Sequence, residues 1–264
     1  MEWPSLLLGT VALRPYVFVF LAVYLTIAIL NMGLVRSILF TLLAYTIAFL
    51  SEYSSTRIGF PYGFYEYIET TRDQELWISN VPFMDSLSYS FLAYVAYTVA
   101  LFMWSPLKVN RWDIRLIESA RVRKSLRVVF SGAIFFMLMD VIIDPIAFQG
   151  DRWFLGKIYT YKEQGEYFNI PLTNFFGWLL VGTCILYSFT RLDGYLDQKL
   201  PYKEQKFPAQ ALLGPGLYFG VLLFNLAVTF YIGEWALGAC GTSLTLMLFW
   251  LLYQKIRYPK RFLL

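Results

Sequence analysis

The sequence contains no histidine, only two cysteines and few charged residues, and each scarcity excludes a class of protein. Across 264 residues, Asp, Glu, Lys and Arg make up 15% of the chain, whereas hydrophobic residues make up 58%. A soluble domain has about 45–50% apolar and about 25% charged residues. The mean hydropathy of +0.53 points the same way. The sequence therefore predicts an integral membrane protein rather than a soluble domain.

The missing histidines remove the usual general base and the commonest metal ligand. They argue against the His-rich iron sites of oxygen-dependent membrane hydroxylases. Cys184 and Cys240 both fall inside apolar runs, where we expect small buried thiols rather than a disulfide. The net charge of +4 is modest, and the basic residues cluster between apolar runs, which indicates membrane orientation rather than nucleic-acid binding.

About seven apolar runs have the length of a membrane-spanning helix, which needs about 20 residues. We place them at 15–33, 36–52, 86–104, 127–147, 172–190, 211–232 and 234–254. The chain has no convincing repeat or domain boundary, so residues 1–264 are predicted to form a single all-α, polytopic membrane domain. The first residues lack a basic region and a small-residue cleavage site, so we do not expect a removed signal peptide.

Basic residues mark one side of the membrane. Because cytoplasmic loops carry excess Lys and Arg, the sequence predicts an outside N-terminus and a cytoplasmic C-terminus, with the cell's inner membrane as the location. The residues that carry this prediction are Arg36; Lys108, Arg111, Arg115, Arg121, Arg123, Lys124 and Arg127; Arg191, Lys199, Lys203 and Lys206; and Lys255, Arg257, Lys260 and Arg261.

This orientation places polar residues from distant parts of the chain together at the outward ends of spans. These residues are Glu52, Asp85, Asp140, Asp144, Asn174 and Glu234. The two longer outer segments, about 53–85 and 148–171, are rich in Gly, Pro, Tyr and Trp. We expect them to form ordered caps at the interface.

Asp140 and Asp144 are four residues apart, so on a helix they project from the same face. Two carboxylates this close in a poorly solvated place cannot both ionise cheaply, so one of them should keep a proton near neutral pH. Pro145 disfavours helix at Asp144, and the helix should kink or end there. The alternative is that both acids sit in the watery headgroup zone. Asp140 lies a turn deeper, where intramembrane acids are usually functional.

Other polar residues have open alternatives. Glu52 is a second acid, a partner of Arg57 or a solvated helix end. Asp85 precedes an apolar run, so it is a helix N-cap or a site residue. Asn174 orients a water or a carboxylate, or else bonds two helices, and Gly177 permits close helix contact.

Tyrosines follow a predicted tight turn at Gly59, Pro61 and Gly63. We expect this turn to hold Tyr62, Tyr65 and Tyr67 at the interface, where such tyrosines more often form an aromatic belt than a site. Some of the aromatic surplus could shield a cationic intermediate.

Two other chemistries are disfavoured. The last span, "EWALGACGTSLTLMLFWLLY", contains no lysine, which argues against a retinal Schiff base. The segment "DVIIDP" resembles half of the aspartate motifs that hold magnesium diphosphate in membrane prenyltransferases, but the Asn/Asp-rich partner motif is missing.

Four segments carry a family resemblance: "SEYSSTRIGFPYGFYEY", "NVPFMDSLSYSFLAY", "MDVIIDPIAFQGDRWFLG" and "YFNIPLTNFFGWLLVG". Their order, over about residues 52–182, resembles the carotenoid biosynthesis membrane family. That family includes hydratases acting on the open ψ-ends of lycopene, γ-carotene and bisanhydrobacterioruberin. The most specific positions are Asp140, Asp144, Pro145, Gly150 and Trp153, followed by Pro171, Leu172, Asn174, Phe175, Gly177 and Trp178.

The resemblance implies addition of water across a terminal C1–C2 double bond through a tertiary cation, without a metal, nucleotide, oxygen or other cofactor. The hypothesis is that Asp140 or Asp144 supplies the proton, the other carboxylate or Glu52 takes a proton from water, and Asn174 orients that water. Asp85 joins this set.

On the same resemblance, we expect Tyr65, Trp153, Phe175 and Trp178 to contact a substrate such as lycopene or γ-carotene, with other carotenoid enzymes as possible partners. Cyclisation or isomerisation of an isoprenoid, and carotenoid binding without catalysis, remain open.

Overall fold

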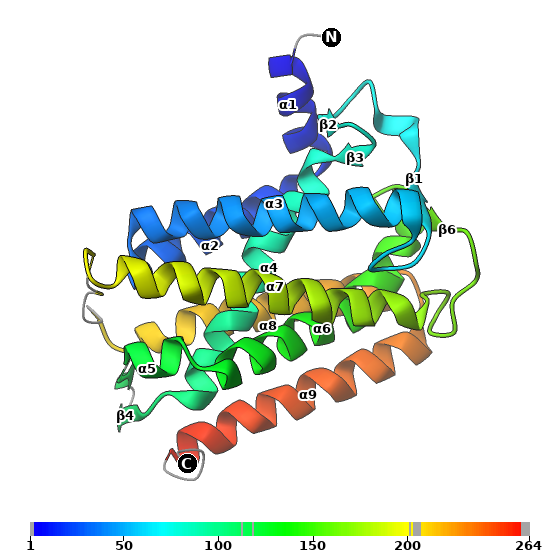
Figure 1. Ribbon diagram of the computed structural model, residues 1–264. Helices are drawn as coiled ribbons and strands as arrows, with labels where there is room; N and C mark the ends of the chain where they lie inside the picture. The colour runs from blue at the N-terminus through cyan, green and yellow to red at the C-terminus, as the bar shows by residue number, and fades with distance from the viewer. Residues whose placement is uncertain (1–2, 112, 118, 201, 203–206, 260–264) are drawn as a thin grey trace.

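A computed structural model describes residues 3–111, 113–117, 119–200, 202 and 207–259 as a bundle of long helices with short strands at both ends (Figure 1). Seven helical segments in this part of the chain are long and apolar enough to cross a membrane. They are α2 (Pro15–Met32), α3 (Leu34–Ile58), α4 (Phe83–Trp104), α6 (Leu126–Phe148), α7 (Leu172–Leu196), α8 (Leu213–Tyr231, preceded by the 3-10 turn η3, Gln210–Leu212) and α9 (Trp235–Arg257). The predicted all-α polytopic bundle is confirmed. Of the basic residues used above, Lys203, Lys206, Lys260 and Arg261 lie outside the described residues.

Proline and glycine set the limits of the first long helices. Pro15 occupies the start of α2, where its missing N–H costs nothing and its fixed φ suits a helix. Gly33, with φ of +82°, separates α2 from α3. Gly59 ends α3 in the left-handed conformation, and its N–H donates to the Ser55 carbonyl. The chain can therefore turn sharply towards the tyrosines that follow.

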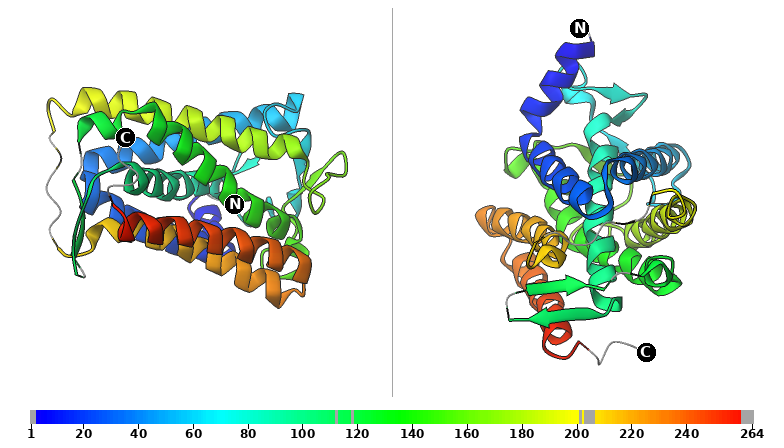
Figure 2. Two further views of the ribbon diagram at one scale, coloured as in Figure 1. Left: turned by 90° about the horizontal axis from the view of Figure 1, so that it is seen from below. Right: turned by 90° about the vertical axis from the view of Figure 1, so that its left-hand side faces the viewer.

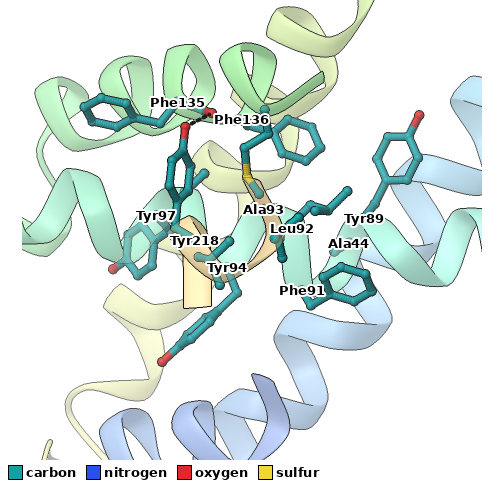
Figure 3. Close-up of a cluster of buried hydrophobic side chains, with 14 of the residues drawn as sticks. Ala44, Tyr89, Phe91, Leu92, Ala93, Tyr94, Tyr97, Phe135, Phe136 and Tyr218 are labelled. Atoms are coloured by element: carbon teal, nitrogen blue, oxygen red, sulfur yellow. Dashed lines mark hydrogen bonds between the residues drawn. The ribbon is translucent and has the colours of Figure 1, made fainter. Parts of the chain in front are cut away.

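Helix α4 runs obliquely through the middle of the bundle, in contact with α2, α3, α6 and α8 (Figures 1 and 2). Within its most apolar 18 residues, 89% are buried, against 28% in α2 and α3. Figure 3 shows the aromatic and small side chains of α4 packed against Ala44, Phe135, Phe136 and Tyr218. The buried Tyr218 hydroxyl donates to the Phe135 carbonyl at 2.9 Å. Helix α4 is therefore a rigid axis around which the other spans are placed.

Short strands lie at both ends of the bundle (Figure 1). At one end, β1 (Tyr65–Tyr67) pairs with β6 (Tyr159–Tyr161), and β2 (Trp77–Ile78) pairs with β3 (Val81–Pro82). The single 3-10 turns η1 (Glu69–Thr71) and η2 (Gly150–Arg152) complete that end. The other end carries the hairpin of β4 (Leu107–Asn110) and β5 (Asp113–Leu116), followed by α5 (Ala120–Arg123). We call the first the tyrosine end and the second the hairpin end.

The first helix, α1 (Trp3–Leu13), was not predicted, and it projects away from the bundle (Figure 1). It is tied to the tyrosine end, because the Thr10 hydroxyl accepts from the Leu76 N–H at 2.8 Å. The following residue, Arg14, forms a buried ion pair with Glu75 at 3.1 Å. This pair fixes the start of α2 against the loop before α4.

Buried ion pairs join three helices at the hairpin end. Arg36 Nε lies 2.7 Å from Asp193 Oδ1, and Arg123 Nη2 lies 2.8 Å from Asp197 Oδ1. Both guanidinium groups also lie over the Tyr202 ring, at 4.1 and 3.6 Å from its centroid. Two cations therefore face two carboxylates, and we call this group the arginine cluster.

One local expectation is wrong: Cys184 and Cys240 are exposed on their helices rather than buried, because both occupy faces that point away from the bundle. Of the two alternatives predicted at Pro145, a kink or an end of the helix, the end is excluded, because α6 continues to Phe148. A proline in the last turn removes a single backbone hydrogen bond, so the helix can pass through it.

Candidate functional site

Polar residues from four spans meet at the tyrosine end. Glu52 lies in the last two turns of α3, Asp85 in the first turn of α4 and Asp144 in the last turn of α6. Asn174 lies in the first turn of α7. These helices run alternately in opposite directions, so residues far apart in sequence reach the same level. Of the six polar residues predicted to lie together, these four line one cavity and Asp140 contacts Asn174, whereas Glu234 does not line the cavity and pairs with Arg152.

A cavity lies between these residues and holds about 940 Å³ of space that protein atoms do not fill. Its polar lining includes Glu52, Asp85, Ser88, Asp144, Asn174 and Asn225. Its aromatic lining includes Tyr16, Phe20, Tyr62, Tyr65, Tyr67, Tyr89, Phe91, Trp153, Tyr159, Tyr161, Trp178 and Phe224. Ligand pockets combine a largely apolar lining with a few convergent polar groups, and this cavity has that character.

The Glu52 cluster consists of Glu52, Tyr67, Asp85 and Ser86. The Tyr67 hydroxyl lies 3.1 Å from Glu52 Oε1 and 2.6 Å from Asp85 Oδ2. The Ser86 hydroxyl donates to the other Glu52 oxygen, Oε2. Glu52 is 1% exposed, so these contacts replace its contact with water.

Hydrogen counting constrains the Glu52 cluster. A tyrosine hydroxyl has one proton to donate, whereas Tyr67 contacts two carboxyl oxygens. For both contacts to be hydrogen bonds, one carboxyl group must carry a proton and donate it to the Tyr67 oxygen. If the shorter contact is donation from Tyr67 to Asp85, Glu52 is the group that carries the proton. Under that condition, the cluster holds an exchangeable proton beside the cavity.

The Asp144 cluster consists of Asp140, Asp144, Tyr159, Tyr161 and Asn174. Asp144 accepts from Tyr159 at 2.6 Å, from Tyr161 at 3.2 Å and from the Asn174 amide at 2.8 Å. The same amide nitrogen donates to Asp140 Oδ2 at 2.7 Å. Three donors on one side chain suit an ionised carboxylate.

Asp140 differs from Asp144. It is fully buried and is not among the residues that line the cavity. Its Oδ1 atom has no hydrogen-bond partner among the described residues. A buried carboxylate with so little support is costly, so a protonated Asp140 fits this position better. Asp140 reaches the cavity only through Asn174 and Asp144.

The short β1–β6 ladder supplies the tyrosines of both clusters. Tyr65 pairs with Tyr161 and Tyr67 with Tyr159, around the central pair Glu66 and Thr160. Alternate residues of a strand share a face, so all four rings lie on one face of the ladder. Tyr65 extends the row, with its hydroxyl 3.5 Å from that of Tyr67. Two segments some ninety residues apart, 65–67 and 159–161, thus form one hydroxyl-bearing roof.

These phenols stay protonated. Burial, followed by the charge of Asp85, raises the pKa of Tyr67 well above its usual value. Burial and the neighbouring Asp144 likewise raise the pKa of Tyr159 and of Tyr161. A neutral phenol is a hydrogen-bond donor, so the roof can orient the carboxyl groups throughout the physiological range.

Close backbone approach holds the turn before β1 in place. A Cβ atom on Gly177 of α7 would clash with the Tyr62 ring and with the Pro61 carbonyl. Gly177 therefore admits the turn at residues 59–63 rather than another helix, which corrects the expectation above. The Tyr62 hydroxyl then reaches Ser51 at 3.0 Å.

Three of the four predicted substrate contacts line the cavity, and one does not. Tyr65, Trp153 and Trp178 line the cavity. Trp178 stacks on Tyr89 with ring centroids 4.5 Å apart, and Trp153 is held by a bond from its Nε1 to the Ile146 carbonyl. Phe175 is not among the lining residues, and its ring packs on Tyr167 instead.

Three alternative roles are not supported. Tyr62, Tyr65 and Tyr67 are buried, so they are not an aromatic belt facing lipid headgroups. Asp85 lies inside α4 and makes no capping bond; the N-cap position is Pro82. Arg57 donates to Asn80 at 2.7 Å, and it forms no ion pair with Glu52 among the described residues.

Sequence reasoning missed Ser86, Tyr159 and Tyr161, and it underrated Tyr67. The segments "YEY" and "YTY" each repeat a tyrosine at alternate positions, but three residues are too few to identify a strand by periodicity. Across the described residues, no three His, Cys, Asp or Glu side chains come together as a metal site.

A family model described as carotenoid biosynthesis protein matches residues 5–249. No curated protein and no solved structure matches the chain. The family match covers nearly the whole chain, including both clusters and every described span except the end of α9. The chain therefore belongs to the carotenoid biosynthesis protein family.

Proposed function

We propose that this protein is a carotenoid hydratase, which adds water to the terminal C1–C2 double bond of an acyclic ψ-end and leaves a tertiary alcohol. The observation that carries the proposal is an aromatic cavity lined both by Glu52, which contacts Tyr67, and by Asp144, which accepts from the Asn174 amide. Family membership supports a carotenoid substrate. The hydratase reaction rests on the resemblance of the cavity-lining segments to ψ-end hydratases.

Glu52 is our candidate for the proton donor. Its proton forms a new C–H bond at C2 with the π electrons of the double bond, which leaves a tertiary cation at C1. Aromatic ring faces attract such a cation, and Trp178, Tyr89 and Tyr62 line the cavity for this purpose. This assignment reverses the sequence-based hypothesis, in which Asp140 or Asp144 was the acid.

Asp144 is our candidate for the base. Water attacks C1, and Asp144 takes the proton that the new C–O bond releases. Exchange with solvent returns a proton to Glu52 and removes one from Asp144, so the net change is the addition of one water. No metal, nucleotide or redox cofactor enters this balance.

Asn174 and Asp140 act as positioning residues in this scheme. The Asn174 amide nitrogen is committed to both aspartates, at 2.7 and 2.8 Å, so it fixes the orientation of Asp144. Its amide oxygen remains for the attacking water. Asp140 holds Asn174 from behind, where its own proton is out of reach of the substrate.

The bilayer would deliver the substrate. With the basic hairpin end in the cytoplasm, the tyrosine end faces outwards, and a carotenoid along the bilayer presents its end group near an interface where water can enter. We place the protein in the cell's inner membrane, where other carotenoid enzymes would supply the polyene.

Pigment analysis tests the proposal. The chain is expressed with lycopene or γ-carotene, and pigments are analysed by mass spectrometry, with the Glu52→Gln protein as the inactive control. A mass gain of one water supports hydration. An isobaric product with changed retention would indicate cyclisation or isomerisation, and unchanged pigment would indicate binding without catalysis.

A further inference from the structure

Aromatic side chains, rather than backbone, close one wall of the cavity. Tyr16 and Phe20 come from α2, Phe224 from α8 and Trp153 from the loop after η2. The Tyr16 and Phe224 rings are nearly parallel, with centroids 5.4 Å apart, and Phe20 meets Phe224 edge-on at 5.6 Å. Trp153 meets Tyr16 at 6.1 Å. Side chains can rotate where a packed backbone cannot, so this wall is the place where a ligand could pass between α2 and α8.

A groove lies on the other side of this wall. It holds about 1110 Å³ of space and is lined by residues 151–154 and by Phe224, Ala227, Val228 and Tyr231 of α8. Trp153 and Phe224 line both the groove and the cavity. The four α8 residues occupy positions i, i+3, i+4 and i+7, so they form one stripe along the helix. The cavity and the groove are therefore neighbours along a continuous stripe of α8.

The groove is built for an apolar chain. Phe154, in the turn after η2, and Tyr231, the last residue of α8, are 61% and 82% exposed, so two large rings lie at the surface beside the groove. One edge is fixed, because the Arg152 guanidinium is paired with Glu234 and also donates to the Ile232 carbonyl. A ligand here would meet ring faces and methyl groups with a single polar rim.

We propose that this groove holds the conjugated polyene chain of a substrate whose end group occupies the cavity, with Tyr16, Trp153 and Phe224 as the portal between them. The inference rests on the proposed function for the identity of the end group. A linear polyene is flat and apolar, so it can lie on aromatic faces and pass from lipid to the cavity without crossing water. The groove would then select long polyenes over short isoprenoids with the same end.

Binding can be measured without turnover. Lycopene is achiral, so it gives visible circular dichroism only when an asymmetric site holds it. The probe is lycopene added to the purified chain in lipid nanodiscs. Ala227→Trp fills the groove with a ring, and Leu223→Trp adds the same ring to an exposed position on α8 that does not line the groove.

The wild type and Leu223→Trp are expected to show the induced signal, and Ala227→Trp to lose it. Tyr231→Ala removes a groove ring without adding bulk and should weaken the signal as well. Turnover of lycopene relative to that of a short isoprenoid with the same end should fall in Ala227→Trp.

An absent signal in the wild type, or an undiminished signal in Ala227→Trp, would overturn the groove assignment. Lycopene binding that Ala227→Trp abolishes, without any water addition by the wild type, would support the groove and remove the hydratase proposal. The two proposals can therefore fail separately.

Discussion

Both ends of the bundle bury carboxyl groups, but the groups at the two ends have different hydrogen-bond and ion-pair partners. In the arginine cluster, Asp193 and Asp197 face Arg36 and Arg123, so each carboxylate has a cationic partner. At the tyrosine end, Glu52, Asp85, Asp140 and Asp144 form no ion pair among the described residues. Their partners are phenols, a serine and an amide.

This difference in partners indicates a stabilising role for the carboxylates of the hairpin end and a proton-transfer role for those of the tyrosine end. Carboxylates paired with arginines stay ionised, and removing one partner of a buried ion pair is strongly destabilising. Carboxyl groups that share neutral donors can instead gain or lose a proton without leaving an uncompensated cation. The hairpin end is thus suited to holding helices together, and the tyrosine end to passing protons to a ligand.

The largest expected effect concerns the two proposed proton handlers. Glu52→Gln and Asp144→Asn should each lower turnover by about 10²–10⁴-fold, the usual contribution of a positioned acid or base. Both substitutions keep the size and shape of the side chain but replace one acceptor oxygen with an NH2 donor, so activity is compared per folded molecule. Product formation per folded protein in nanodiscs is the measurement. Glu66→Gln, on the exposed face of β1, is the matched control. Full activity in both site variants would remove the carboxyl mechanism.

The arginine cluster should respond in the opposite way. Asp193→Asn leaves Arg36 and Arg123 short of a carboxylate and should cost about 3–5 kcal/mol of stability. Thermal unfolding in nanodiscs measures the loss, and turnover per folded molecule should stay near that of the wild type. Asp113→Asn removes a solvent-exposed pair with Arg115 on the hairpin and should leave the stability nearly unchanged. Equal stability losses in the two variants would contradict the structural role of the cluster.

Removing single hydroxyl groups from the tyrosines of the β1–β6 ladder tests which of them supports the carboxyl groups. Tyr67→Phe removes a bond to a carboxyl group worth about 1.5–3 kcal/mol, so turnover should fall by about ten- to a hundredfold. Tyr65→Phe removes a hydroxyl whose nearest contact is 3.5 Å away, and it should have the smaller effect. Steady-state turnover of both proteins tests the order. A larger loss in Tyr65→Phe would place the proton path through Tyr65 instead.

The smallest expected effect concerns pH: the phenols of the tyrosine end should not ionise in the range in which free tyrosine does. Because burial raises the pKa of Tyr67, Tyr159 and Tyr161, their neutral forms persist to higher pH than those of free tyrosine. Turnover should therefore show no loss from tyrosine ionisation up to pH about 10, the ordinary tyrosine value. Tyrosinate absorbance during an alkaline titration measures this directly. Early ionisation of these three phenols, assigned with the Phe variants, would show that water reaches the roof.

Much of the fold was predictable because membrane spans depend on long apolar runs and because loop charges set the order of their ends. The gathering of Glu52, Asp85, Asp144 and Asn174 followed from that order alone. The central position of α4 did not follow, because a helix in the middle of the bundle and a helix facing lipid are both apolar.

The sequence predicted some side-chain positions of the site correctly and others wrongly. Phe175 was predicted as a substrate contact, but successive helix residues are rotated by about 100°, so the residue after Asn174 points elsewhere, whereas Trp178 returns to the same face. The Y-x-Y strands are three residues long, too short for periodicity to distinguish them from a loop. Their pairing across the chain required the tertiary structure.

The β1–β6 ladder gives the site a local twofold arrangement. Its register is centred on Glu66 and Thr160, so its two halves exchange under a local twofold rotation. On each side of the ladder, the chain follows the same order of parts: a span with an acid near its end, a Y-x-Y strand, and a span with a polar side chain in its first turn. In the proposed reaction, the two acids that correspond in this arrangement, Glu52 and Asp144, take opposite roles, one as proton donor and the other as base.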